Sequence, residues 1–221
     1  MWVYKNLGTQ NYLSVWQAMQ QFTQERTETT PDEFWIVQHP PVFTQGQAGK
    51  PEHLLNAHNI PVIQTDRGGQ ITYHGPGQLV IYCLIDLTRL NIHTRQLVLK
   101  IEQSIINTLK ILGIESIGNR EAPGVYVPDL KGDKKIASIG LRVKQGRSYH
   151  GLSLNVDNDL TPFSYINPCG IKDQEVTNLQ KLGCKKTIAE VEKILLEKLA
   201  GEFSLLPTLS QNSREEALLK L

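Results

Sequence analysis

The sequence contains the stretch Arg67-Gly68-Gly69-Gln70-Ile71-Thr72-Tyr73-His74-Gly75-Pro76-Gly77-Gln78, which leads directly into the uncharged apolar run Leu79–Ile85. An apolar run of this length predicts a strand that is covered on both faces. Glycines allow a backbone to turn tightly and to approach a ligand closely. A glycine-rich turn before a strand is the simplest interpretation of the stretch. The polar side chains between the glycines nevertheless favour a functional loop at the start of a buried strand.

Segments on either side of this stretch predict a mixed architecture. Helices are expected where apolar residues recur at helical spacing beside capping residues, in segments 11–25, 94–112 and 187–199. Short strands are expected in segments 34–37, 60–63, 124–127, 136–143 and 149–156, the last three as an antiparallel meander. Because strands and helices do not alternate strictly, the predicted fold class is α/β (α+β), with mixed sheets flanked by helices.

The composition is that of an ordinary globular domain. The chain has 221 residues, a formal net charge of +1 and 40% hydrophobic residues. Its balanced charge gives no electrostatic reason to expect nucleic acid as a partner, and no apolar run is long enough to span a membrane. Three cysteines are too few for a disulfide framework and indicate a reducing compartment. We therefore expect a cytoplasmic protein that binds neither a membrane nor nucleic acid.

Two further segments carry reactive side chains. Lys135 opens an apolar segment in which Ala137, Ser138 and Gly140 are small, so this strand has room for a ligand beside it. A solvated turn is the simpler interpretation of the lysine. Cys169 lies between a proline and a glycine, and therefore on a loop, where a thiol in a reducing compartment is a candidate nucleophile.

The remaining cysteines and histidines are less informative. Cys83 lies inside the apolar run and is expected to be an inert core residue. Cys184 is followed by two lysines and stays open as a second reactive thiol. No spacing of cysteines or histidines fits a metal site, so no metal is expected.

Residues 67–82 resemble the signature of the bacterial lipoyl(octanoyl) transferase family, also called lipoate-protein ligase B. The signature combines Arg-Gly-Gly, Thr, an aromatic residue, His and Gly-Gln at fixed spacing, before an aliphatic strand with Tyr. Every specified position is met. Further matches follow in family order: Pro123-Gly124-Val125-Tyr126, Lys135-Ile136-Ala137-Ser138-Ile139-Gly140, His150-Gly151-Leu152-Ser153-Leu154-Asn155-Val156 and Pro168-Cys169-Gly170.

The resemblance implies a fold and a reaction. The fold is that of biotin and lipoate ligases, with a larger mixed sheet, a smaller sheet and flanking helices. Residues 1–207 would form a single catalytic domain, followed by a C-terminal tail at 208–221. The enzyme would be an octanoyltransferase of lipoate biosynthesis that takes its acyl group from octanoyl-acyl carrier protein. The acceptors would be lysines in the lipoyl domains of 2-oxoacid dehydrogenases and in the glycine cleavage H protein, and no cofactor is expected.

The resemblance also assigns roles to residues. Cys169 matches the family nucleophile, which carries the octanoyl group as a thioester, and Lys135 matches the lysine that assists it. The substrate-binding residues implied are Arg67, Gly68, Gly69, Gln70, Ile71, Thr72, Tyr73, His74, Ser138, Ile139, Gly140, Gly151, Leu152 and Ser153.

A thiolate and an ammonium suit acyl transfer for chemical reasons. A neighbouring ammonium stabilises the attacking thiolate and can protonate the departing thiol. To act later as a base for the attacking amine, Lys135 needs a pKa below its ordinary value, which burial is expected to produce. Gly170 or the glycines of the 68–77 loop could donate N–H groups to the oxyanion.

The residues alone are also compatible with different activities. His74 or His150 could act as the general base of a cysteine hydrolase, although a histidine that shapes the pocket is favoured. An ATP-using ligase on the same fold would also fit these residues, as would a non-enzymatic acyl-binding module. Basic residues near one turn-rich region could steer an acidic acyl carrier protein. They are Lys131, Lys134, Arg142, Lys144 and Arg147.

Overall fold

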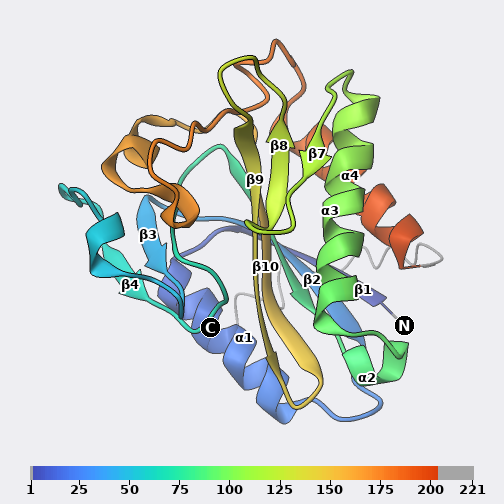
Figure 1. The fold of residues 1–221 in the computed structure, drawn as a ribbon. Helices are drawn as coiled ribbons and strands as arrows, with labels where there is room; N and C mark the ends of the chain where they lie inside the picture. The colour runs from blue at the N-terminus through green and yellow to red at the C-terminus, as the bar shows by residue number, and fades with distance from the viewer. Residues whose placement is uncertain (1, 204–221) are drawn as a thin grey trace.

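Two β-sheets form the framework of the computed structural model, which describes residues 2–203 (Figure 1). The larger sheet has seven strands in the order β1-β2-β6-β10-β9-β8-β7, and the smaller sheet has three in the order β4-β3-β5. Strand β1 runs parallel to β2 and β3 runs parallel to β4, whereas the other pairs are antiparallel. The mixed sheets confirm the predicted fold class. The predicted tail at 208–221 lies outside the described residues.

The elements have the following bounds. The strands of the larger sheet are β1 (Trp2–Thr9), β2 (Asp32–Gln38), β6 (Gln78–Leu84), β7 (Ile117–Gly118), β8 (Gly124–Val127), β9 (Lys134–Lys144) and β10 (Arg147–Asn155). Those of the smaller sheet are β3 (Val42–Gln45), β4 (Val62–Gln64) and β5 (Ile71–His74). The α-helices are α1 (Tyr12–Glu25), α2 (Leu87–Leu90), α3 (Thr94–Ile111) and α4 (Ile188–Glu202). Three 3-10 helices are η1 (Pro51–His53), η2 (Thr161–Tyr165) and η3 (Pro168–Gly170).

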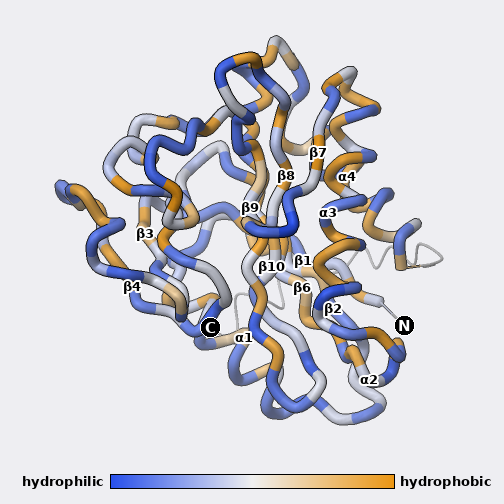
Figure 2. The backbone as a smooth tube through the Cα atoms, in the orientation of Figure 1, coloured by the Kyte–Doolittle hydropathy of each residue, from blue (hydrophilic) through white to orange (hydrophobic). Residues whose placement is uncertain are grey.

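Strand β6 lies between β2 and β10, and all of its residues are buried. Helices α3 and α4 cover one face of the larger sheet, where Leu97 and Leu195 pack against Ile81. Helix α1 covers part of the other face, where Met19 packs with Val80. In Figure 2, α3 alternates between hydrophobic and hydrophilic residues, as expected for a helix with one buried face. The apolar run is therefore covered on both faces, as its composition predicted.

Helices α1 and α4 begin at the positions that their capping residues predicted. The side chain of Asn11 accepts the N–H of Leu13 at 2.9 Å and caps α1. Thr187 and Glu190 form the predicted capping box at the start of α4. The predicted meander is also confirmed, because β8, β9 and β10 are antiparallel neighbours.

Three strands that pair with distant segments were not predicted, and neither was the two-residue strand β7. Strand β5 lies inside the glycine-rich stretch, so Ile71 to His74 form a short strand where a turn was expected. Strand β3 begins directly after Pro41, although proline is rare inside a sheet. Strand β1 occupies the N-terminus. All three depend on pairing with distant partners, which a local pattern does not contain.

Candidate active site

Strand β9 contains one extra residue where it pairs with β8, and this bulge sets the position of Lys135. Val125 pairs with Ala137, but the next residue of β8, Tyr126, pairs with Lys135. Ile136 is therefore the extra residue, and both Ile136 and Ala137 pack in the core beneath α3 and α4. Because side chains alternate along a strand, the bulge turns Lys135 toward the opposite face of the sheet.

The amine of Lys135 is buried among hydrogen-bond acceptors. Lys135 is only 2% exposed. Its Nζ donates to the hydroxyl oxygen of Tyr126 at 2.7 Å and to the carbonyl of Pro123 at 3.2 Å. The Tyr126 hydroxyl donates in turn to the carbonyl of Ala122 at 2.8 Å. A Cβ at Gly124 would lie 3.0 Å from Lys135 Nζ, so a glycine there leaves space for the amine.

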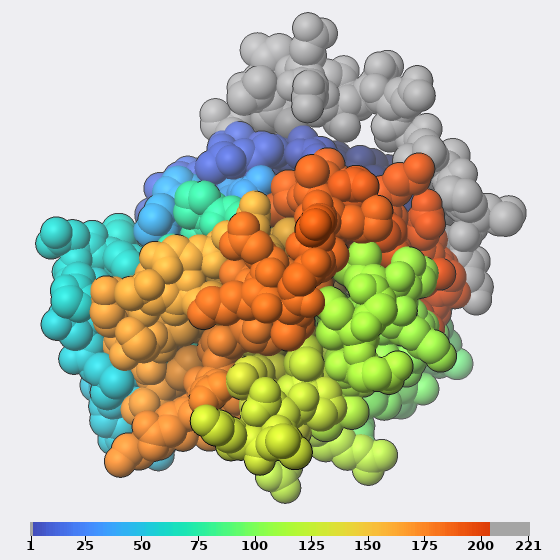
Figure 3. Space-filling model, turned by 90° about the horizontal axis from the view of Figure 1, so that it is seen from above, coloured from blue at the N-terminus to red at the C-terminus, as the bar shows by residue number. Residues whose placement is uncertain are grey.

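The segment that carries Cys169 is attached on both of its sides. The N–H of Asn167 donates to the carbonyl of His53 at 2.8 Å, and the N–H of Lys135 donates to the carbonyl of Glu175 at 2.9 Å. Figure 3 shows this segment (orange) packed between the chain near residue 50 (cyan) and the turn that precedes β9 (yellow-green). These attachments hold the loop of Cys169 over the start of β9.

Cys169 lies in η3 and contacts the amine of Lys135. Its φ of 56° is a left-handed conformation that few residues other than glycine adopt. Burial lowers the pKa of Lys135, but its electrostatic and hydrogen-bond interactions with Cys169 and Tyr126 raise that pKa overall. The prediction that burial brings the pKa of Lys135 below its ordinary value is therefore wrong for the free protein, in which the lysine keeps its proton.

A cavity lies beside Cys169, between the larger sheet and β5. Counted together with the solvent space at its open mouth, its empty volume is about 480 Å³. Its floor is formed by small residues of paired strands, with Ser138 opposite Ser153 and Gly140 opposite Gly151. These small side chains leave the room that the sequence predicted beside this strand.

The structure brings most of the predicted substrate-binding residues to this cavity. Its lining includes Arg67, Gly69, Gln70, Ile71, Thr72, His74, Ser138, Ile139, Gly140, Gly151, Leu152 and Ser153, together with Cys169. Two predicted residues lie elsewhere. Gly68 donates its N–H to the carbonyl of Leu141 at 2.8 Å. Tyr73 lies on the other face of β5 and packs against Phe43 and Phe163.

Arg67 is a buried cation at the cavity wall. Its guanidinium donates to the hydroxyl of Thr44 at 3.0 Å, to the carbonyl of Gly68 at 2.9 Å and to the carbonyl of Gln70 at 2.6 Å. These bonds tie the glycine-rich loop to β3. The acceptors of this guanidinium among the described residues are neutral, so its positive charge is available to favour an anion at Cys169.

His74 and His150 line the cavity, but neither forms a hydrogen bond to Cys169 within the described part of the chain. Nδ1 of His74 donates to Oε1 of Gln78 at 2.7 Å, and burial lowers the pKa of His74 to about 3. Nε2 of His150 lies 2.8 Å from Oδ1 of Asp66. This arrangement favours histidines that shape the pocket over the base of a cysteine hydrolase.

Two of the N–H groups considered for an oxyanion hole are already used. Gly170 donates to the carbonyl of Asn167 at 2.9 Å, and Gly68 donates to Leu141. The expectation that Gly170 supplies an oxyanion donor is therefore not supported. Gly170 instead makes room, because a Cβ there would lie within 2.5 Å of the side chain of Gln70.

Sequence reasoning missed several residues of the site. Tyr12, Val80 and Tyr82 also line the cavity, and Tyr126 contacts the amine of Lys135. Tyr82 and Tyr126 lie inside matched motifs, so a signal for them was present. Tyr12 had no such signal, because its approach depends on how α1 packs against the sheet.

The five basic residues predicted to steer an acidic partner do not form one patch. Lys134 and Lys144 are the first and last residues of the 11-residue strand β9, so its whole length separates them. Lys134 also forms an ion pair with Asp129 at 2.9 Å. The predicted basic patch is therefore wrong.

The sequence also raised the questions of a metal site, a membrane span and further reactive thiols. Within residues 2–203, no group of three or more His, Cys, Asp or Glu side chains could hold a metal ion. No helix in the described part of the chain is long and apolar enough to cross a membrane. Cys83 is fully buried and burial raises its pKa, as predicted for an inert core thiol. Cys184 is partly buried and lies outside the cavity lining.

Known structures resemble this fold. A bi-partite lipoate protein ligase from Thermoplasma acidophilum has a TM-score of 0.74 at 17% identity, over 98% of this chain and 89% of that chain. A biotin protein ligase from Aquifex aeolicus has a TM-score of 0.55 at 13% identity, over 92% of this chain and 70% of that chain. At these identities the comparison shows the fold alone, and it confirms the predicted ligase-like architecture.

Sequence comparison identifies the family. Residues 11–200 match the family model described as the lipoyl protein ligase A/B catalytic domain. An octanoyltransferase from Shewanella halifaxensis is 56% identical over 201 residues, which cover 91% of this chain and 90% of that protein. The chain therefore belongs to the octanoyltransferase family within the lipoyl protein ligase A/B catalytic domains.

Proposed function

We propose that this octanoyltransferase carries its acyl group as a thioester on Cys169, between octanoyl-acyl carrier protein and a lysine of a lipoyl domain. The observation that carries the proposal is the placement of Cys169 against the buried amine of Lys135, beside a cavity that Cys169 itself lines. The octanoyltransferase relatives support the acyl group. The archaeal lipoate protein ligase, whose structural study includes its E2 lipoyl domain, supports the acceptor.

In the first step the Cys169 thiolate attacks the carbonyl carbon of the donor thioester. The bond from that carbon to the pantetheine sulfur breaks, and Lys135 gives a proton to the departing thiolate. The products are an octanoyl thioester on Cys169, a free thiol on the carrier protein and a neutral Lys135. One thioester replaces another, so the step is close to energetically even and needs no ATP.

Acylation prepares Lys135 for the second step. The interaction with Cys169 opposes the effect of burial and keeps Lys135 protonated in the free protein. Acylation turns the sulfur into a neutral thioester and removes that interaction, so burial then favours the neutral amine. Lys135 accepts the proton of the attacking lysine while the new amide forms and Cys169 leaves as a thiolate. The thioester becomes a more stable amide, and the starting ion pair is restored.

Intact mass spectrometry after exposure to octanoyl-acyl carrier protein tests this proposal. The wild-type protein is expected to gain one octanoyl group, whereas Cys169→Ala is expected to gain none. Cys184→Ala is the matched control and should be labelled as the wild type is. Addition of an apo lipoyl domain should discharge the adduct and acylate that domain. Labelling of Cys169→Ala, or transfer only from free octanoate with ATP, would contradict the proposal.

Tyr126→Phe is expected to lower the rate of Cys169 acylation by about tenfold or more and to leave KM nearly unchanged. The substitution removes an acceptor 2.7 Å from Lys135 Nζ but keeps the ring, whose centroid lies 4.7 Å from that atom. A hydrogen bond to a charged group contributes roughly 1.5–3 kcal/mol. Single-turnover kinetics with the acyl donor measure the effect. A variant with wild-type kcat would show that Tyr126 does not position the lysine.

A further inference from the structure

Glu102 is a buried carboxylic acid that the proposed acyl transfer does not use. It belongs to α3 and is 6% exposed. Its neighbours on the buried face of the helix include Ile101 and Ile105, which pack in the core. An acidic group in such a place is costly unless it has hydrogen-bond partners. The contacts of Glu102 therefore indicate its role.

The partner of Glu102 is a backbone N–H beside the end of β7. Helix α3 packs against β7 and β8 (Figure 1), and Oε1 of Glu102 accepts the N–H of Gly124 at 3.1 Å. The last residue of β7, Gly118, pairs with Val125, so Gly124 lies one position beyond this ladder. A Cβ at Gly118 would lie 3.3 Å from Oε2 of Glu102. The carboxylate thus binds the start of β8 at a point that β7 does not reach.

The same peptide unit binds the amine of Lys135. The N–H of Gly124 and the carbonyl of Pro123 belong to one peptide unit, and this carbonyl accepts a hydrogen bond from Lys135 Nζ at 3.2 Å. The described residues contain no cis peptide bond, so the N–H and the C=O of this unit point in opposite directions. Glu102 and Lys135 therefore bind its two ends, and at most about 9 Å separates the carboxylate oxygen from the amine.

The charges of Glu102 and Lys135 act on each other across this peptide. Burial raises the pKa of Glu102, whereas the N–H of Gly124 and the charge of Lys135 oppose that rise. Neither side chain forms a direct ion pair within residues 2–203. Hydrogen bonds in a chain polarise one another. A carboxylate at the N–H end therefore makes the carbonyl at the other end a stronger acceptor for an ammonium.

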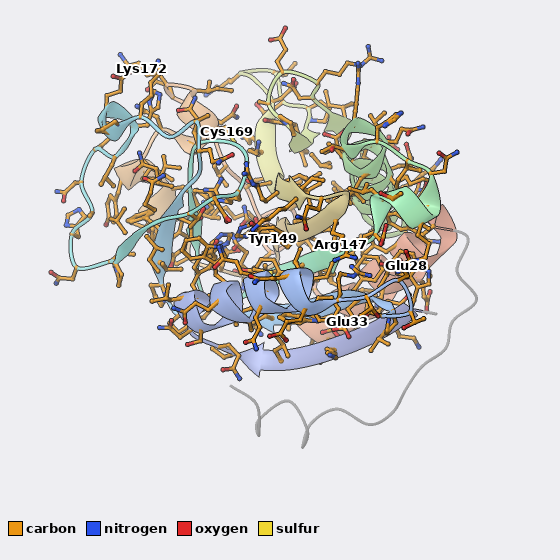
Figure 4. All side chains as sticks on the ribbon, turned by 90° about the horizontal axis from the view of Figure 1, so that it is seen from below. Glu28, Glu33, Arg147, Tyr149, Cys169 and Lys172 are labelled. Carbon is orange, nitrogen blue, oxygen red and sulfur yellow. The ribbon has the colours of Figure 1, made fainter. Side chains whose placement is uncertain are left out.

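Glu102 acts from outside the acyl cavity. In Figure 4, Cys169 lies to one side of strands β9 and β10 (pale yellow), and α3 (pale green) lies to the other. Among the described residues, those that line the cavity do not include Glu102. Its influence on the reaction therefore passes through the peptide unit and not through contact with the substrate.

We propose that Glu102 positions Lys135 through the peptide unit that joins Pro123 to Gly124. The carboxylate fixes the orientation of this peptide, and the polarised carbonyl of Pro123 in turn holds the amine beside Cys169. Glu102 is thus a positioning residue for acyl transfer, placed on the other side of the sheet from the thiol. The inference rests on the proposed role of Lys135 in the acylation of Cys169.

Single-turnover acylation by octanoyl-acyl carrier protein, followed by intact mass, tests the inference. At saturating donor, Glu102→Ala is expected to react about tenfold more slowly than the wild type, because the charge-assisted bond to Gly124 is lost. The donor concentration for half-maximal rate should not change. Glu102→Gln keeps an oxygen acceptor and should stay within about threefold of the wild-type rate. Thr108→Val is the matched control, since Thr108 is a buried polar residue of α3 that donates to the carbonyl of Ser104, and it should react at the wild-type rate.

NMR observes the peptide unit directly. The sequence contains Pro-Gly pairs at 76–77 and 123–124 alone, so protein labelled with carbonyl-13C proline and 15N glycine gives one correlation for each. Glu102→Gln retains the shape of the side chain but is a weaker acceptor, and it should move the Gly124 proton upfield. Lys135→Met should move the Pro123 carbonyl resonance. The correlation of Gly77 should stay in place in both variants.

The outcomes separate the inference from the proposed function. A wild-type rate in Glu102→Ala, a Glu102→Gln variant as slow as Glu102→Ala, or a Gly124 proton that does not move in Glu102→Gln would overturn the positioning role. Failure of the wild-type protein to gain an octanoyl group on Cys169 would instead overturn the proposed function.

Discussion

Lys135→Met is expected to slow the acylation of Cys169 by about two to three orders of magnitude at neutral pH. Methionine retains most of the length of the side chain but removes the charge that lies beside Cys169. The variant loses both the stabilisation of the nucleophile and the proton donor for the departing thiol, and general acid–base catalysis alone contributes about 10²- to 10⁴-fold. Single-turnover labelling followed by intact mass measures the effect.

A variant that keeps the positive charge separates the charge of Lys135 from the proton that it donates. Lys135→Arg is the matched control, since it keeps a charge but cannot release its proton. It should form the adduct faster than Lys135→Met but more slowly than the wild type, and it should fail to pass the adduct on. Acylation of Cys169 in Lys135→Met at the wild-type rate would contradict the proposed mechanism.

The free energy of unfolding is expected to fall by about 4 kcal/mol when the pH is lowered from about 7.5 to about 5. Burial lowers the pKa of His39 to about 4 and that of His74 to about 3, below the value of about 6.5 in an unfolded chain. Between these values the unfolded chain binds more protons, so stability is lost as the pH falls. Each histidine contributes about 2 kcal/mol over this interval.

Urea denaturation at the two pH values measures this loss. His39→Gln should remove about half of the pH dependence, because glutamine can replace the contacts to the carbonyl of Gln10 and the hydroxyl of Tyr82 without titrating. His58→Asn is the matched control, since His58 is exposed and asparagine tolerates its positive φ. A free energy of unfolding that is equal at both pH values would contradict the assignment of buried neutral histidines.

The helices could be predicted from the sequence because their signals are local. The side chain of Asn11 and the Thr187 capping box act within one turn of the residues they cap. Strands β1, β3 and β5 could not be predicted, since a strand of four residues such as Ile71–His74 is stable only through its pairing with a distant segment. The nearby glycines suggested a turn, but pairing with β3 makes this segment a strand.

In the candidate site, too, local motifs could be recognised in the sequence, whereas contacts between distant residues could not. Cys169 and Lys135 were identified through motifs, and the structure places them in contact, while their roles stay predictions. The pKa of Lys135 could not be foreseen, because its direction depends on the distance to Cys169 and Tyr126 as well as on burial. The link from Asp66 to His150 joins residues 84 positions apart, and neither residue alone carries a signal for it.

The extra residue in β9 shifts the alternation of side chains along the strand by one position. Upstream of Ile136 the alternation of side chains is reversed relative to the strand that follows it. Loss of that single position would direct the amine of Lys135 into the apolar layer under α3 and α4, where a charged group is costly. The protein would then lose both a buried isoleucine and the amine that lies beside Cys169.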